Sequence, residues 1–452
     1  MAPEAHSEAL GKANAYPTKA FFVRMLTRDI SLDACILDLI DNAVDAAWRT
    51  ANGMPTTFKT GNTLDKYEVQ LNIDVSGKQF RILDNCGGIS LDDAAAYAFT
   101  FGRDEEQATG DFAVGVYGIG MKRAIFKLGT QIRVRSTHSD DPPFSVPIDV
   151  DAWMAQESKI WDFDIDTDAA LPEPGVEILV SSLTDATRVA FSDPAFLNRL
   201  RSTIAQDYLL ALMQGFRIVL NGDAVKPWGL RLRSGAGFEP MRELYQDEEV
   251  SVEIFAGMVG LPEDDASDTS READRRSGWY ILCNGRVVVT ADRTSTTVWG
   301  RHPFPSWHPQ YEGFVGVALF SSRRPELLPM TTTKSGVDTA SPIYRRAITR
   351  MQQPTRAWID YTNSRKAFLE DARAKEESTR AVAIAEVPTR KGVKLPASRK
   401  PVARHEANIL YTVPLTKLQP LARAFGRATM AYKQVGLRSF EYAYEQLVDE
   451  DD

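Results

Sequence analysis

The sequence is poor in the residues that build disulfide frameworks and common metal sites. Its three cysteines, Cys35, Cys86 and Cys283, lie far apart and form no CxxC pair. This spacing disfavours a disulfide framework and a zinc knuckle, and it fits a reducing compartment. The five histidines are scattered along the chain, which argues against histidine-based catalysis and against a multi-histidine metal site.

Long apolar runs are also missing. Apolar runs such as 257–262 are far shorter than the roughly 20 residues that a membrane span needs. The first 20 residues lack the basic-then-apolar pattern of an export signal. We therefore expect a cytoplasmic protein with no membrane partner.

The charge balance excludes a chain that is basic throughout. Asp and Glu number 61 against 53 for Lys and Arg, a net charge of −8, so any contact with nucleic acid must be local. The segment 387–404 has six basic residues, three prolines and no acid, which predicts a flexible linker. Its basic side chains are candidates for DNA contact, with a merely solvated linker as the alternative: Arg390, Lys391, Lys394, Arg399, Lys400 and Arg404.

Apolar periodicity divides the chain into helical and strand-rich zones. It predicts helices at 33–48 and 194–214, and strands at 67–75, 79–83, 217–220, 250–259, 278–289 and 313–320. The acidic stretch 262–277 predicts an exposed loop. A charged helical stretch follows at 342–384, interrupted at Pro354, and the tail 408–447 is helical again.

Three segments carry residues suited to chemistry. On a helix over 34–48, Asp38, Asn42 and Asp45 fall within about 60° of one another, opposite an apolar face. A solvated acidic face is the plain alternative. In RILDNCGGIS, 81–90, a strand ends in Asp84 and turns through two glycines, which lets a ligand approach the main chain. In VGVYGIGMKRAIFKLG, 114–129, a glycine-rich loop opens a helix, an arrangement suited to phosphate but without Walker A spacing.

In this order the three segments resemble the GHKL ATPase superfamily, which includes gyrase-type topoisomerases, MutL, ninety-kilodalton heat-shock chaperones, sensor histidine kinases and MORC proteins. The resemblance covers residues 20–185. It implies an α+β fold: a GHKL (Bergerat) α/β-sandwich ATPase domain, then an α+β transducer-like domain and a helical C-terminal region. It also implies that the protein binds ATP and Mg²⁺.

The resemblance assigns roles to single residues. Asn42 matches the Mg²⁺ ligand, and Asp38 matches the general base that activates water, where the family usually has Glu. Asp45 matches a position near the adenine end of the pocket, with helix stabilisation as an equal alternative. Asp84 matches the carboxylate that accepts a hydrogen bond from the adenine amine, and Gly88 lets the base lie against the backbone.

The same family pattern places a mobile ATP lid at 92–113, with a helix at 92–101. The residues that would close on the phosphates with this lid are Gly115, Gly118, Gly120 and Lys122. Two positions depart from the pattern: Cys86 stands where glycine is usual, and Val176 stands where threonine is common.

The second zone resembles the transducer domain of MutL, gyrase and MORC proteins. In LPMTTTKSG, 328–336, Lys334 matches the lysine that this domain lends to the γ-phosphate, with an ordinary surface lysine as the alternative. The closest resemblance is to compact prokaryotic MORC- or MutL-like proteins. The domains expected are an arm at 1–19, the ATP-binding domain at 20–185, the transducer-like domain at 186–340, a helical region at 341–385, a basic linker at 386–407 and a helical module at 408–452.

We therefore expect a slow ATPase that works as an ATP-gated clamp and forms a homodimer on binding ATP. Its process would be DNA-associated defence, repair or chromosome maintenance, and the C-terminal module could dock a protein partner. Two alternatives remain open: a chaperone-like ATPase that acts on protein, and a nucleotide-sensing scaffold with negligible hydrolysis.

Overall fold

The computed structural model describes residues 18–58, 61–101, 110–115, 118–157, 160–260, 275–396, 409 and 411–448. Nearly all of the predicted N-terminal arm, most of the loop predicted at 262–277 and residues 397–408 lie outside these ranges. The contacts divide the chain into two compact units, 1–398 and 399–452.

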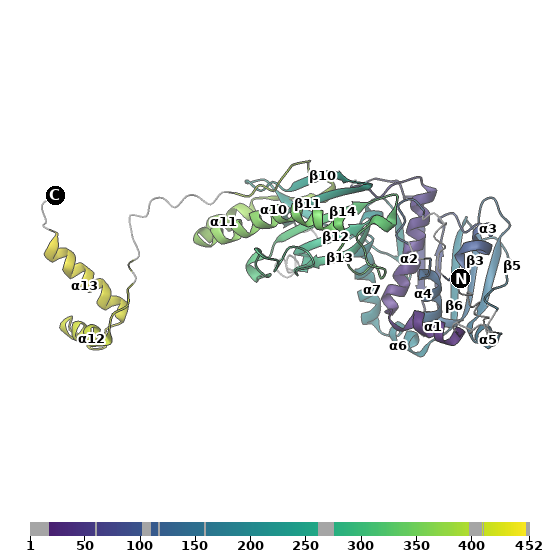
Figure 1. The fold of residues 1–452 in the computed structure, drawn as a ribbon, viewed down its shortest axis with the longest axis horizontal. Helices are drawn as coiled ribbons and strands as arrows, with labels where there is room; N and C mark the ends of the chain where they lie inside the picture. Colours follow the sequence, from purple (N-terminus) through teal and green to yellow (C-terminus); the bar gives the residue numbers. More distant parts are fainter. Residues whose placement is uncertain are drawn as a thin grey trace, which may run out of the picture. The chain divides into compact units, whose positions relative to one another are not determined.

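A first sheet of eight strands forms the N-terminal half of the larger unit (Figure 1). All neighbouring strands are antiparallel except β1 and β7, which are parallel. Buried and exposed residues alternate along β1, so one face of the sheet is covered and the other is solvated. In sheet order the strands are β5 (Asp166–Thr167), β4 (Phe144–Asp149), β3 (Gly129–Thr137), β6 (Gly175–Leu183), β2 (Gln79–Asp84), β1 (Glu68–Ile73), β7 (Arg217–Leu220) and β8 (Asp223–Ala224).

Helices cover the buried face, and α2 supplies the largest share of that core. The Ser31 hydroxyl caps its first turn by accepting from the N–H of Ala34. Ile36, Ile40 and Val44 then repeat at helical spacing and pack into the sheet core. The helices of this half are α1 (Lys19–Arg28), α2 (Leu32–Thr50), α3 (Leu91–Asp93), the π-helical turn η1 (Ala94–Ala98), α4 (Gly120–Leu128), α5 (Val150–Ala155), α6 (Asp185–Phe191), α7 (Pro194–Asp207) and α8 (Leu209–Met213).

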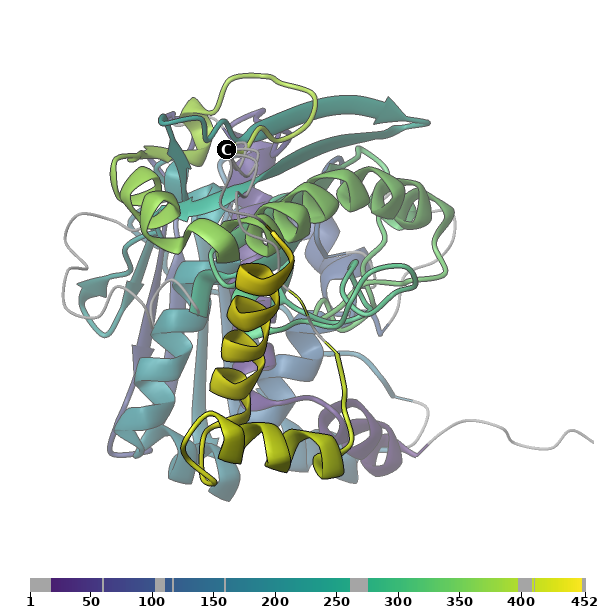
Figure 2. The ribbon, with the colours of Figure 1, turned by 90° about the vertical axis from the view of Figure 1, so that its left-hand side faces the viewer.

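A second sheet of seven strands lies under the long helix α10 (Pro342–Arg365), which runs across it in Figures 1 and 2. Every residue of β12 and β14 is buried, so both faces of this sheet are covered. One face packs on α10, and the other packs on α8 and on Phe58 of the first half. The strands in order are β13 (Arg286–Asp292), β12 (Gly278–Cys283), β14 (Phe314–Ser321), β11 (Val250–Gly260), β9 (Arg231–Ser234) and β15 (Arg380–Ala383), with β10 (Met241–Asp247) paired to β11.

These elements confirm the predicted α+β class, and most predicted helices and strands occur within two residues of their expected ends. The sheet extends past the predicted boundary at 185/186, because β7 and β8 complete the first sheet. The strand predicted at 278–289 is instead a hairpin. Asn284 and Gly285 form its turn with φ of 45° and 83°, as Asn-Gly turns between strands commonly do.

Two expectations about the helical stretch 342–384 are wrong. Pro354 does not interrupt α10, because its ring is buried on the face that packs against the second sheet and tertiary packing overrides the lost hydrogen bond. Residues 380–383 form β15, which pairs with β9, instead of a helix. Other helical elements of the second half are η2 (Pro309–Tyr311), η3 (Pro325–Leu327), η4 (Lys366–Phe368), α11 (Leu369–Glu377) and η5 (Ile384–Glu386).

The basic segment predicted as a linker is ordered over 387–396. Arg390 and Lys394 make backbone bridges to Arg242 and Glu239. Both of these basic side chains also pair with the Glu239 carboxylate, Lys394 at 3.1 Å. Val387 is buried. This half of the segment is therefore part of the larger unit, because backbone pairing and buried apolar contacts hold it.

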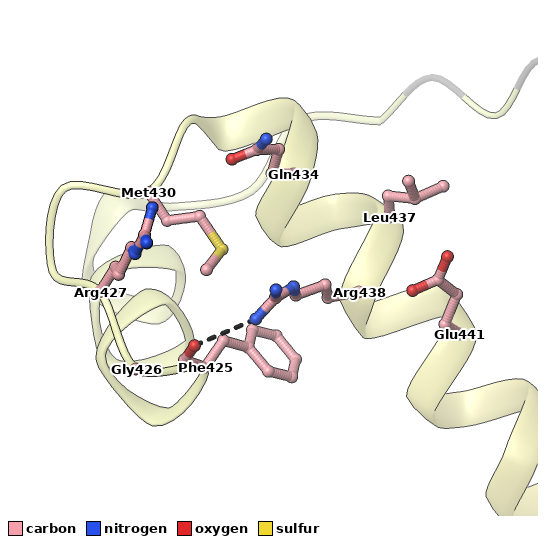
Figure 3. Close-up of a pocket in the computed structure, with 8 residues that line it drawn as sticks. All are labelled: Phe425, Gly426, Arg427, Met430, Gln434, Leu437, Arg438 and Glu441. Carbon is pink, nitrogen blue, oxygen red and sulfur yellow. Dashed lines mark hydrogen bonds between the residues drawn. The ribbon is translucent and has the colours of Figure 1, made fainter.

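The small C-terminal unit consists of α12 (Leu415–Ala424) and α13 (Tyr432–Leu447). Among the described residues of this unit, the buried core consists of Ala422, Met430 and Val435. Figure 3 shows a pocket that Met430 helps to line, where the Arg438 guanidinium donates to the carbonyl of Phe425 at 3.2 Å. Within the described ranges, no helix is long and apolar enough to cross a membrane.

Candidate functional site

The acidic face of α2 lies between the two halves of the larger unit. Asp38 and Asp41 are 4% and 2% exposed, whereas Asn42 is exposed and Asp45 is half-buried. Carboxylates buried this deeply need cationic or hydrogen-bonding partners. Three cations reach this face, and two of them come from the second half of the chain.

Lys334 is the first of these cations. It sits in a tight turn closed by hydrogen bonds from Thr331 N–H to the Gly336 carbonyl and from Lys334 N–H to the Thr331 carbonyl. Its backbone has a φ of +55°, an uncommon conformation for a residue with a side chain. The Nζ atom lies 2.7 Å from Asp41 Oδ2 and 3.1 Å from Asp38 Oδ1. The predicted transducer lysine therefore reaches the predicted base, across 296 residues of sequence.

Arg286 is the second cation, from the start of β13. Its Nε lies 3.0 Å from Asp41 Oδ1, and its Nη1 lies 2.6 Å from an Asp207 oxygen. The Tyr208 hydroxyl also donates to Asp41 Oδ1, at 2.7 Å. Burial alone would raise the pKa of Asp41, but Lys334 and Arg286 outweigh it and hold that pKa below its ordinary value.

Arg123 of α4 is the third cation and lies 2.5 Å from Asp38 Oδ2. Both oxygens of Asp38 are thus paired with cations. Gly120, at the first position of α4, lies against the same carboxylate: a Cβ there would stand 3.3 Å from Asp38 Cγ. The N-terminus of α4 therefore packs directly against the Asp38 carboxylate.

Asp45 holds the end of the predicted lid. Its carboxylate accepts hydrogen bonds of 2.9–3.0 Å from the backbone N–H groups of Val114 and Gly115. Burial raises its pKa to about 6, although these two N–H groups oppose the rise. The Asn284 side chain, in the β12–β13 turn, donates to the Ala113 carbonyl at 3.1 Å. This end of the lid is therefore fixed to both halves of the chain.

The start of the lid is held by Lys122. This lysine is 3% exposed, and its Nζ donates to the Ala98 carbonyl of η1 at 3.0 Å. The helix predicted at 92–101 is in fact the short α3 followed by the π turn η1, which ends at Ala98. The middle of the lid, 102–109, lies outside the described residues. Gly118, with a φ of +64°, belongs to the loop that leads into α4.

Asp84 lies at the end of β2, away from these ion pairs. Its Oδ1 accepts from the N–H of Cys86 at 2.9 Å and from the N–H of Val176 at 3.4 Å. Burial raises the pKa of Asp84 to about 6, with these N–H groups opposing it. Gly175 permits the close approach of β6, because a Cβ there would stand 1.9 Å from the Asp84 carbonyl oxygen.

Gly88 has a packing role that the sequence did not predict. Its φ is +78°, and a Cβ would stand 2.1 Å from the carbonyl oxygen of Thr137. The space that its missing side chain leaves is filled by the backbone of β3. Gly88 is therefore required for packing the loop after β2, and a base lying on it stays a prediction.

Sequence reasoning missed Asp41, Arg123, Arg286, Asp207 and Tyr208. Asp41 could have been found, because it lies 60° from Asp38 on the same helix face. Arg286 follows the Asn-Gly turn signal at 284–285, but nothing local connects it to α2. Among the described residues, no group of three or more His, Cys, Asp or Glu side chains has the arrangement of a metal site.

Residues 30–167 match the family model described as histidine kinase-, DNA gyrase B- and HSP90-like ATPase. This range contains α2, Asp84 and the glycine loop, so the match covers the three segments that carry the chemistry. No curated protein matches the chain.

Proposed function

We propose that the protein hydrolyses Mg²⁺·ATP with a site completed by its second half. The match of residues 30–167 to a GHKL-type ATPase model supports ATP binding. The observation that carries this proposal is the ion pair of Lys334 with Asp38 and Asp41. An ordinary surface lysine would remain in solvent and would not reach a buried acidic cluster on a helix of the first half. A lysine that stabilises phosphate charge must reach this cluster, because the predicted base lies there.

The residues around α2 and β2 fit the nucleotide. Asp84 offers a carboxylate for the adenine amine at one end. At the other end, Asn42 is exposed, and its Oδ1 lies 3.7 Å from where a Cβ of Gly115 would stand, so it faces the glycine loop. An amide oxygen is a suitable ligand for Mg²⁺, which when bound would offset the phosphate charge.

Asp38 would act as the general base. Both of its oxygens are paired with cations, so it can accept a proton from water only after Lys334 moves from Oδ1. The Lys334 ammonium would then neutralise charge that develops as the terminal phosphate leaves. This exchange of partners links the chemical step to the position of the second half.

We further propose that this link operates as an ATP-gated clamp in a homodimer, in a DNA-associated process. The ordered part of the basic segment supports DNA contact less than its composition suggested, because Glu239 pairs with both Arg390 and Lys394. Arg399, Lys400 and Arg404 lie outside the described residues. DNA affinity that falls steeply with salt would support this role, and its absence would favour a protein substrate.

A nucleotide-sensing scaffold is the second candidate. Asp38 is one methylene shorter than the usual Glu and is held by two cations, which favours slow or absent turnover. The two candidates differ in turnover, so Asp38→Ala tests them. In the ATPase, this variant should bind ATP like the wild type by calorimetry but lose phosphate release, and Lys334→Ala should do the same. Equal phosphate release by wild type and Asp38→Ala would reject Asp38 as base.

A further inference from the structure

We propose that Asp41 is the positioning residue for Lys334: Arg286 and Tyr208 fix the Asp41 carboxylate, which keeps the lysine at the phosphate side while Asp38 acts as base. The inference rests on the proposed ATPase function. The nucleotide-binding motifs assign no role to Asp41, Arg286 or Tyr208.

The geometry of Asp41 divides its two oxygens between two tasks. Oδ1 accepts from Tyr208 Oη at 2.7 Å and from Arg286 Nε at 3.0 Å. Oδ2 accepts from Lys334 Nζ at 2.7 Å. The single proton of the Tyr208 hydroxyl has the Leu37 carbonyl as a second acceptor at 2.8 Å, so Arg286 is the main donor that holds Oδ1. With Oδ1 held in a buried position, Oδ2 stays aimed at the lysine.

The donors to Asp41 are themselves held. Asp207 accepts from Arg286 at 2.6 Å, and the guanidinium lies 4.8 Å from the centre of the Tyr208 ring. Asp207 and Tyr208 are the last residue of α7 and its C-cap, so the positions of Arg286 and Asp41 are tied to that helix. The chain of contacts runs from α7 through Arg286 and Asp41 to Lys334.

Asp41 and Asp38 are not equivalent partners for the lysine. Nζ is nearer to Asp41 than to Asp38, 2.7 Å against 3.1 Å. Asp38 must give up this contact to accept a proton, whereas Lys334 and Arg286 hold the pKa of Asp41 below its ordinary value and so favour its ionised form. With Asp41 alone, the lysine would remain within the site after its contact with Asp38 is broken. The strained φ of Lys334 also requires an anchor of this kind.

The test uses Asp41→Asn, which keeps the shape of the side chain but removes its charge. We expect kcat for ATP to fall at least about tenfold with KM changed less than about threefold, because the interaction acts on the reaction and not on binding. Lys334→Ala should show a similar loss, and the double variant should lose no more than either single one. Tyr208→Phe, a milder change at the same carboxylate, should give a smaller loss in the same direction.

Glu253→Gln is the matched control. Glu253 is also a buried carboxylate between the two halves, paired with Arg242 and accepting from the N–H of Phe58, but it does not touch Lys334. It should retain the kcat of the wild type if loosening of the interface alone is harmless. A loss in Glu253→Gln equal to that in Asp41→Asn would overturn the proposal. The proposal would also be overturned if the loss of kcat in the double variant equalled the product of the losses in Asp41→Asn and Lys334→Ala.

Amide hydrogen exchange separates this inference from the proposed function. Exchange of residues 331–336 reports the hydrogen bonds of the Lys334 turn whether or not the protein hydrolyses ATP. Faster exchange there in Asp41→Asn, with β11 unchanged, supports the anchor. Unchanged exchange rejects it. A wild type that binds but does not hydrolyse ATP would reject the ATPase, and the exchange result would still decide on the anchor.

Discussion

Nucleotide affinity should depend on pH through Asp84. The ionised carboxylate is the form that accepts most strongly from the adenine amine, and burial raises the pKa of Asp84 from 3.8 to about 6. At pH 7.5 nearly all of the carboxyl groups are ionised, and at pH 5 about one in eleven is. The affinity for ATP should therefore fall about tenfold between these pH values, or about 1.4 kcal/mol.

Calorimetry of the wild type and Asp84→Asn in the same buffers isolates this effect. The variant should bind ATP more weakly by about 1–3 kcal/mol at pH 7.5, because its neutral amide lacks the charge that strengthens a hydrogen bond to a carboxylate. The titration of ATP itself is common to both proteins, so the ratio of their affinities removes it. That ratio should narrow about tenfold on going to pH 5. Burial also raises the pKa of Asp45 to about 6. The variant Asp45→Asn retains Asp84, so its ATP affinity should still fall between pH 7.5 and pH 5.

The result that would refute this reasoning is a ratio that stays constant from pH 7.5 to 5. It would mean that Asp84 does not hold the base in its ionised form. The sign for stability is opposite to that for binding. Since folding raises the pKa of Asp84, its contribution to the free energy of unfolding is present below about pH 4 and is lost as the pH rises through about 6.

Local pattern was sufficient for the elements around the site. The helix predicted at 33–48 is α2, and the strands predicted near 67–75 and 79–83 are β1 and β2. Each has a regular apolar period and a turn or cap at its end, such as Ser31 before α2. Three predictions were wrong because each used one local signal. An apolar run was taken as one strand although it contains an Asn-Gly turn, Pro354 was expected to interrupt a helix that packing sustains, and a basic segment was expected to be a linker although part of it packs on the larger unit.

The ion-pair network could not be predicted in the same way. Asp41 meets Arg286 across 245 residues, and no local period specifies which strand end will face which helix. Lys334 was found because its turn resembles a known loop, not because the residues around it required a partner. Arg286 has no such pattern. Contacts of this kind follow from the packing of the second sheet on α8 and Phe58, which only the tertiary structure shows.

Three further predictions concern binding, modularity and assembly. Asn42→Ala should weaken Mg²⁺·ATP binding by about 1–3 kcal/mol in calorimetry, and unchanged binding would remove Asn42 from the site. A chain ending at Ser398 should keep the ATP affinity and thermal midpoint of the full chain, because the contacts divide there; a large drop in either would show that the C-terminal unit supports the larger one. Finally, a non-hydrolysable ATP analogue should convert the protein into a closed dimer, measured by light scattering and small-angle X-ray scattering. The physical reason is that Lys334 of the second half is bound by Asp38 and Asp41 of the first half, and Asn284 of the second half binds the Ala113 end of the lid. Nucleotide that displaces either contact therefore shifts one half relative to the other. A mass and radius of gyration unchanged by saturating analogue would exclude the clamp and leave a monomeric switch.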